Sequence, residues 1–103
     1  MNIKLSKIKK PFVIAELSAN HNGNINNIYK LIDKAKKNGA SAIKIQSYTP
    51  DSMTLDCKNK YFYIKNGLWK SSYLYDLYKK GTTPYSWHKK IFDYAKKKKF
   101  CVS

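Results

Sequence analysis

The order of short apolar runs and amphipathic stretches constrains the fold of this chain more than any other feature. Residues 11–16 form a mostly apolar run after a proline, as expected of a buried strand. A second run covers residues 41–46, and a third opens at residues 100–103. The first two are separated by about one βαβ unit, which takes roughly 30 residues or more. Crossover connections of this kind make strands parallel, so the pattern predicts the α/β class.

An amphipathic helix is predicted between the first two strands. Apolar residues recur there at three- and four-residue spacing, at Ile25, Ile28, Ile32 and Ala35. Asn24 can cap the start of this helix, and Gly39 can end it in a left-handed conformation.

A long connection, about residues 47–83, separates the second strand from a second long helix. Connections of this length are usually functional or contain structure of their own, and residues 72–80 have the pattern of a short helix. Thr83 and Pro84 then predict an N-cap followed by proline at the first helical position. The apolar stripe of the second long helix consists of Trp87, Ile91, Tyr94 and Ala95.

Three parallel strands and two long helices cannot cover both faces of a sheet. A closed (β/α)8 TIM barrel takes about 250 residues, against 103 here. We therefore expect residues 1–103 to be the N-terminal part of such a barrel, incomplete as it stands.

The chain is strongly basic, with a formal net charge of +15. This charge favours a basic nucleic-acid-binding domain as an alternative of another class. The basic residues are 21 lysines and no arginine, although arginine makes the bidentate contacts typical of nucleic-acid sites. Lys, Asn, Ile and Tyr are abundant together, and all four are encoded by AT-rich codons. Such a codon bias explains both the excess of lysine and the absence of arginine, so we expect no nucleic-acid partner.

The two cysteines, Cys57 and Cys101, are far apart and do not have metal-ligand spacing. Reduced thiols in a cytoplasmic protein are therefore expected. The apolar run at residues 12–15 is shorter than the roughly 7–15 residues of a signal-peptide core. No apolar segment has the length of a membrane span, so no membrane partner is expected.

Strand alternation predicts the candidate site. Lys44 and Gln46 share one face of the second strand, while Ile43 and Ile45 share the other. Glu16 comes at the carboxyl end of the first strand, and TIM-barrel active sites lie at that end of the strands. The pattern predicts a lumen site for an anionic substrate with Lys44 as its partner; a purely structural Glu16–Lys44 ion pair is the alternative.

The two histidines do not predict a metal site. His21 lies alone in a turn of Asn and Gly residues, where a loop hydrogen bond is the commoner role. His88 follows Trp87 on the predicted second helix, where packing or a surface role is expected.

These same residues carry a family resemblance. Residues 11–23 (PFVIAELSANHNG) resemble the opening strand and loop of the sialic acid synthase family, and residues 38–48 (NGASAIKIQSY) resemble its second strand. The pair Leu17 and Ser18, with the long connection, is most similar to the pseudaminic acid synthase branch. The resemblance covers nearly all of the chain from Pro11 onward.

The resemblance implies a transferase that condenses phosphoenolpyruvate with an N-acetylated amino sugar of the 6-deoxy-diacetamido-hexose type. The product would be a nine-carbon nonulosonic acid, pseudaminic acid, with release of phosphate. Synthesis of N-acetylneuraminate or legionaminate is the alternative within the family. A divalent metal, Mn²⁺ or Mg²⁺, is also implied, with its ligands outside this chain.

By the same resemblance, Glu16 handles protons and Lys44 binds phosphoenolpyruvate and balances developing charge. Gln46 and Asn20 would hydrogen bond to substrate, and the long connection would help to form the sugar pocket. The family's C-terminal antifreeze-like domain has no counterpart in this chain, and a homodimer is expected at full length. The 103-residue piece alone is expected to be inactive.

Overall fold

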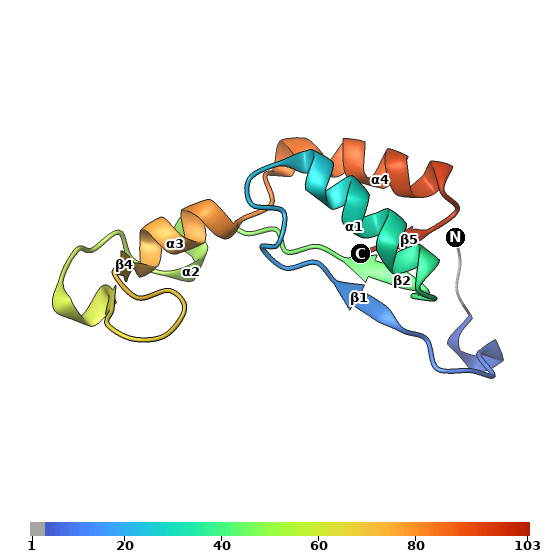
Figure 1. Cartoon of the computed structure of the whole chain (residues 1–103), viewed down its shortest axis with the longest axis horizontal. Coiled ribbons are helices and arrows are strands. Elements are labelled where there is room, and N and C mark those ends of the chain that lie inside the picture. The colour runs from blue at the N-terminus through green and yellow to red at the C-terminus, as the bar shows by residue number, and fades with distance from the viewer. Residues whose placement is uncertain (1–3) are drawn as a thin grey trace.

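The computed structural model describes residues 4–103. Their central element is a parallel three-stranded sheet in the order β1-β2-β5, formed by β1 (Ile14–Glu16), β2 (Ala42–Lys44) and β5 (Cys101–Val102). Two helices, α1 (Ile25–Lys37) and α4 (His88–Lys97), lie side by side over one face of this sheet, and the other face has no helix over it (Figure 1). The parallel α/β class is confirmed, and the closed barrel stays a prediction.

Helix α1 forms where its sequence predicts it. The side chain of Asn24 accepts a hydrogen bond of 2.9 Å from the backbone N–H of Asn26, which satisfies one of the free donors of the first turn. At the other end Gly39 has a φ of +88°, a left-handed conformation that glycine adopts without strain. The chain can therefore turn sharply after α1 and enter β2.

The core lies between the sheet and the two helices. Ile43 of β2 is fully buried, and so are side chains from both covering helices, namely Ile28, Ile32, Ile91 and Ala95. Burying one aliphatic side chain of this size contributes about 1.5–3 kcal/mol. The predicted apolar stripes of both helices are thus confirmed as the faces that form the core with the sheet.

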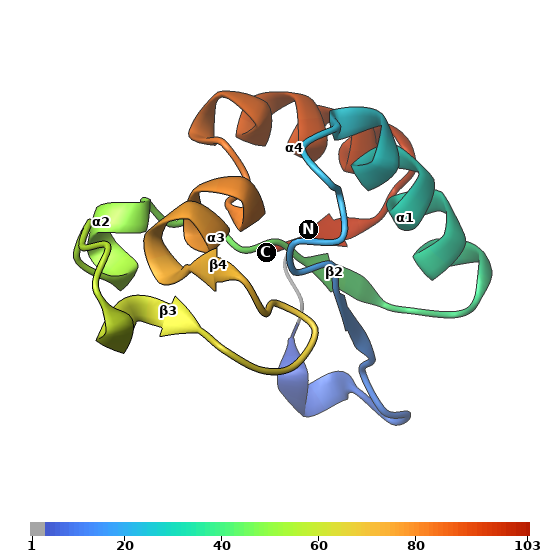
Figure 2. The same cartoon turned by 60° about the vertical axis from the view of Figure 1, so that its left-hand side comes forward.

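Residues 49–81, which we call the arm, leave the sheet after β2 and return before α4. The arm contains α2 (Pro50–Met53), α3 (Leu74–Gly81) and an antiparallel pair formed by β3 (Tyr63–Ile64) and β4 (Ser72–Tyr73). It projects sideways from the sheet and its helices (Figures 1 and 2), and it accounts for much of the 50 Å long axis. The helix expected at residues 72–80 is confirmed as α3.

The predicted start of the second long helix is wrong in detail. Pro84 caps a short 3₁₀ turn, Tyr85–Trp87, and the α-helix begins only at His88. The buried hydroxyl of Thr83 makes no capping bond. The backbone N–H of Thr83 instead donates to the carbonyl of Gln46 at 3.2 Å. Thr83 therefore contacts the chain at the end of β2 and does not cap α4.

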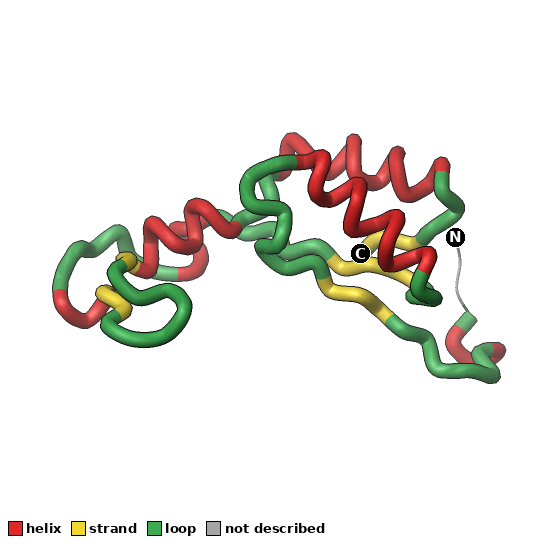
Figure 3. The backbone as a smooth tube through the Cα atoms, viewed as in Figure 1, coloured by secondary structure: helices red, strands yellow, loops and turns green. Residues whose placement is uncertain are grey.

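Two short 3₁₀ helices complete the structure, one at Leu5–Lys7 and one at Lys60–Phe62. Loops and turns connect the short regular elements of the arm (Figure 3). Within residues 4–103, no helix combines the length and the apolar character that crossing a bilayer would require.

Candidate functional site

Three predicted site residues meet on the face of the sheet opposite the helices. Glu16 and Lys44 are direct partners in the parallel register of β1 and β2. The ammonium Nζ of Lys44 lies 3.5 Å from Oε2 of Glu16, and Nε2 of Gln46 donates to Oε1 of Glu16 at 2.5 Å. One oxygen of the carboxylate thus faces an ammonium and the other accepts a hydrogen bond, so the three side chains form one polar group.

The alternation that predicted this group is confirmed. Ile43 and Ile45 are buried under the helices, while Lys44 lies on the open face with 53% of its side chain exposed. Glu16 is 40% exposed, because three strands form a slab rather than an enclosed lumen. An ion pair this exposed is worth about 0–1 kcal/mol, so structural stability explains little of its placement.

Asn20 is engaged in its own turn instead. Its side-chain Nδ2 donates to the carbonyl of Leu17 at 3.0 Å, and its backbone N–H donates to the same carbonyl. Ser18 and Asn22 in this loop have positive φ angles of 46° and 49°. No hydrogen bond links Asn20 to the Glu16 group among the described residues, and its role as a substrate ligand stays a prediction.

His21 is the buried centre of the same loop. Its Nδ1 accepts the N–H of Gly23 at 3.0 Å, so a neutral ring carries its proton on Nε2. The ring packs edge-on against Trp87 with 5.5 Å between centroids. Burial lowers the pKa of His21, and the backbone of Gly81 partly opposes the shift, although Nε2 makes no well-directed hydrogen bond. The predicted loop hydrogen bond is confirmed.

Sequence reasoning missed a set of contacts at the base of the arm. Gln46, Ser47 and Tyr48 each bond to the returning chain: the carbonyl of Gln46 to Thr83, the hydroxyl of Ser47 to His88, and the carbonyl of Tyr48 to Thr82. We call these three contacts the clamp. They join residues more than 30 positions apart, which no local spacing could have indicated.

A cleft of about 760 Å³ lies next to the ends of β1 and β2. Its lining includes Ala19 and Tyr48, which follow the two strands, and Trp69, Leu77 and Tyr78 of the arm. Glu16, Lys44 and Gln46 are not among its lining residues. The cleft is thus distinct from the polar group, and its surface is mostly apolar, with Tyr48, Trp69 and Tyr78 among the aromatic residues.

The described residues do not form a metal site. Among residues 4–103, no three His, Cys, Asp or Glu side chains come together as a metal ion would require. In the polar group, Glu16 is the one carboxylate, and its oxygens face Lys44 and Gln46. The residues present thus do not fit a divalent metal.

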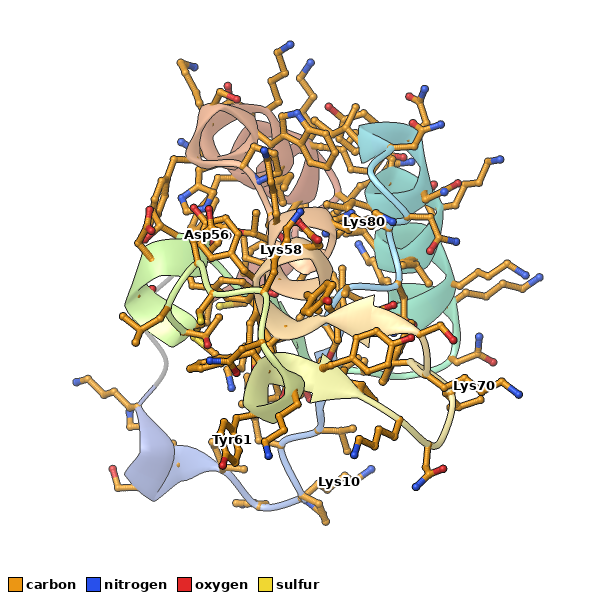
Figure 4. The ribbon with its side chains drawn as sticks, turned by 90° about the vertical axis from the view of Figure 1, so that its left-hand side faces the viewer. Lys10, Asp56, Lys58, Tyr61, Lys70 and Lys80 are labelled. Carbon is orange, nitrogen blue, oxygen red and sulfur yellow. The ribbon has the colours of Figure 1, made fainter. Side chains whose placement is uncertain are left out.

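Several lysines lie on the arm. Figure 4, a view along the long axis from the end of the arm, labels Lys58, Lys70 and Lys80. Lys58 also lies 3.8 Å from the carboxylate of Asp76. Part of the positive charge on the arm is therefore paired with a carboxylate.

Comparison with known proteins places the chain in a family of synthases. The NeuB family model matches residues 31–103. The chain is 56% identical to a pseudaminic acid synthase of Campylobacter jejuni over 87 residues, which cover 84% of this chain and 25% of that protein. It is 42% identical to the pseudaminic acid synthase of Helicobacter pylori over 90 residues, 87% of this chain and 26% of that protein.

A third relative, the N,N'-diacetyllegionaminic acid synthase of Legionella pneumophila, is 37% identical over 66% of this chain and 19% of its own length. The chain belongs to the NeuB family, which is the sialic acid synthase family. Within it, the sequence is pseudaminic acid synthase-like, as expected from its motifs. The chain spans about a quarter of the length of the pseudaminic acid synthases it matches.

Proposed function

We propose that this chain supplies the first part of the active site of a nonulosonic acid synthase that makes pseudaminic acid. The observation that carries the proposal is the convergence of Glu16, Lys44 and Gln46 on the open face of the sheet. The similarity to two pseudaminic acid synthases supports the choice of product.

In the proposed reaction, carbon 3 of phosphoenolpyruvate attacks the aldehyde carbon of an open-chain N-acetylated amino sugar. Water adds at carbon 2, and the C–O bond to phosphate breaks, which gives the 2-keto-3-deoxy acid and inorganic phosphate. Negative charge on phosphoenolpyruvate needs a fixed cation, and Lys44 supplies one on the open face. The amide of Gln46 provides a hydrogen-bond donor beside it.

Substrate binding would also change the partners of Glu16. In the structure, the ammonium of Lys44 is paired with Oε2 of Glu16 at 3.5 Å. A phosphate or carboxylate group of the incoming substrate would compete with Glu16 for that ammonium. Glu16 would then be free to accept a proton from the attacking water, while Gln46 continues to hold its other oxygen. Gln46 thereby orients the carboxylate of Glu16 before substrate arrives. The carboxylate becomes available to accept a proton only after phosphoenolpyruvate has bound.

The cleft formed by the arm and by residues that follow β1 and β2 is the proposed sugar site. Its aromatic and aliphatic lining, with Trp69, Tyr48 and Leu77, suits the methyl groups of a 6-deoxy sugar with two acetamido substituents. A sugar with a full set of hydroxyls would leave polar groups against this surface without partners. The lining thus favours pseudaminate over N-acetylneuraminate as the product.

The implied Mn²⁺ or Mg²⁺ would be held by residues outside this 103-residue chain, because residues 4–103 do not fit such an ion. A homodimer at full length remains a prediction of the family resemblance.

The test uses the full-length polypeptide with whatever sequence flanks these 103 residues in its gene. Phosphate release would be measured with phosphoenolpyruvate and three sugars: the 6-deoxy-diacetamido precursor of pseudaminate, the precursor of legionaminate, and N-acetylmannosamine. We expect turnover with the first to exceed the others by at least tenfold. Preference for either other sugar would correct the product, and no phosphate release with any sugar would refute the synthase proposal.

A further inference from the structure

The side-chain contact of the clamp joins two residues that the proposed chemistry does not use. Oγ of Ser47 lies 2.5 Å from Nε2 of His88, and both side chains are partly buried. Ser47 directly follows Gln46, the residue that donates to Glu16. The bond between Ser47 and His88 therefore holds the residue next to Gln46, which is part of the Glu16 group.

Ser47 cannot itself take part in chemistry on the open face. Its hydroxyl reaches the first residue of α4, and α4 covers the opposite face of the sheet. Successive side chains of an extended chain point to opposite sides, so Ser47 lies on the helix side while Gln46 lies on the side of Glu16. A bond that holds Ser47 against α4 consequently fixes the direction in which Gln46 projects.

His88 is well held for this role. Its ring packs edge-on against Tyr85 at 5.3 Å between centroids and lies against Phe92 at 6.4 Å. The other two clamp contacts are made to backbone carbonyls, those of Gln46 and Tyr48, and leave side chains free to turn. The contact with His88 is the one that fixes a side chain of the strand end.

We propose that His88 is a positioning residue of the synthase, which acts through Ser47 to fix the end of β2. It thereby sets the positions of Lys44 and Gln46 relative to Glu16. This inference rests on the proposed function, because its kinetic consequence needs a reaction at the Glu16 group. Among residues 4–103, His88 makes no hydrogen bond to this group and does not line the cleft.

The test compares His88→Leu and Ser47→Ala with His88→Gln in the full-length protein. Leu and Ala remove the contact, whereas Gln places an amide nitrogen at nearly the same reach as Nε2. We expect kcat/KM for phosphoenolpyruvate to fall about 10- to 100-fold in the first two variants, because small misplacements of reacting groups have effects of this size. His88→Gln should stay within about threefold of the wild type, and Lys90→Leu on the same helix is the control.

A double variant separates positioning from general damage. If Ser47 and His88 act as one unit, Ser47→Ala with His88→Leu should lose no more activity than the worse single variant. Multiplied losses in the double variant, wild-type kinetics in His88→Leu, or failure of Gln to restore activity would each overturn the proposal.

Amide hydrogen exchange tests whether His88 anchors the end of β2, and it does not depend on enzyme activity. Residues 45–48 should exchange faster in His88→Leu than in the wild type or in His88→Gln, because the strand end loses its side-chain anchor. If the wild type releases no phosphate, the proposed function fails, while unchanged exchange at residues 45–48 in His88→Leu would still refute the clamp as a positioning device.

Discussion

Replacing Lys44 by alanine tests whether the ion pair with Glu16 serves stability or chemistry. The two charges lie 3.5 Å apart, with side chains 53% and 40% exposed. A pair this accessible to water contributes at most about 1 kcal/mol to folding. The free energy of unfolding of Lys44→Ala should therefore change by less than about 1 kcal/mol.

The effect of Lys44→Ala on activity should be much larger than its effect on stability. If Lys44 balances charge that develops on phosphoenolpyruvate, its loss should resemble the removal of one fixed donor from an active site. Such removals cost about 100- to 1,000-fold in rate, equivalent to about 2.7–4 kcal/mol. We therefore expect kcat/KM for phosphoenolpyruvate to fall at least 100-fold in a protein that unfolds at nearly the same urea concentration as the wild type.

Lys89→Ala is the matched control. Lys89 forms an exposed ion pair with Asp93 on α4, with 2.6 Å between charged atoms. Its removal should leave activity unchanged. The reasoning is refuted if Lys44→Ala keeps turnover within about threefold of the wild type. It is also refuted if Lys44→Ala loses more than about 2 kcal/mol of stability, because the pair would then be structural.

Two further predictions concern the core and the loop before α1. Ile43→Ala empties a fully buried site in the central strand and should lower the free energy of unfolding by about 2–5 kcal/mol, measured by urea titration; a loss below about 1 kcal/mol would contradict the assigned core. Burial depresses the pKa of His21, so the folded state binds fewer protons than the unfolded state just below the ordinary value of about 6.5. The stability due to His21 is therefore fully present above about pH 6.5 and lost as the pH falls toward the folded pKa. Melting temperatures at about pH 7.5 and pH 5.5 should differ less in His21→Gln than in the wild type, and an equal difference in both proteins would contradict this.

The parts of the fold that depend on local periodic patterns in the sequence could be predicted from it. Helix α1 was predictable because its apolar spacing, its cap at Asn24 and its end at Gly39 all agree. The face shared by Lys44 and Gln46 was predictable because alternation in a strand depends only on position along the chain. Their contact with Glu16 also requires the register that pairs Glu16 with Lys44; the crossover connection implies parallel strands but does not set this register.

The remaining features depend on contacts between distant residues. Strands β3 and β4 have two residues each, too few to show a period of two. The start of α4 differs from the prediction because Thr83 bonds to the end of β2 instead of capping a helix. The bond between Ser47 and His88 spans 41 positions, so only the folded chain reveals it.

The clamp also bears on how such a chain can diversify. Tyr48 and Thr82 flank the arm, and the hydroxyl of Thr82 bonds to the carbonyl of Tyr48. Because both ends of the arm are fixed at one point, its length and side chains can change without moving β2 or α4. Selection can therefore remodel the arm's wall of the proposed sugar site by insertion, deletion or exchange of one continuous segment. The strand residues that meet phosphoenolpyruvate in the proposed reaction would stay as they are.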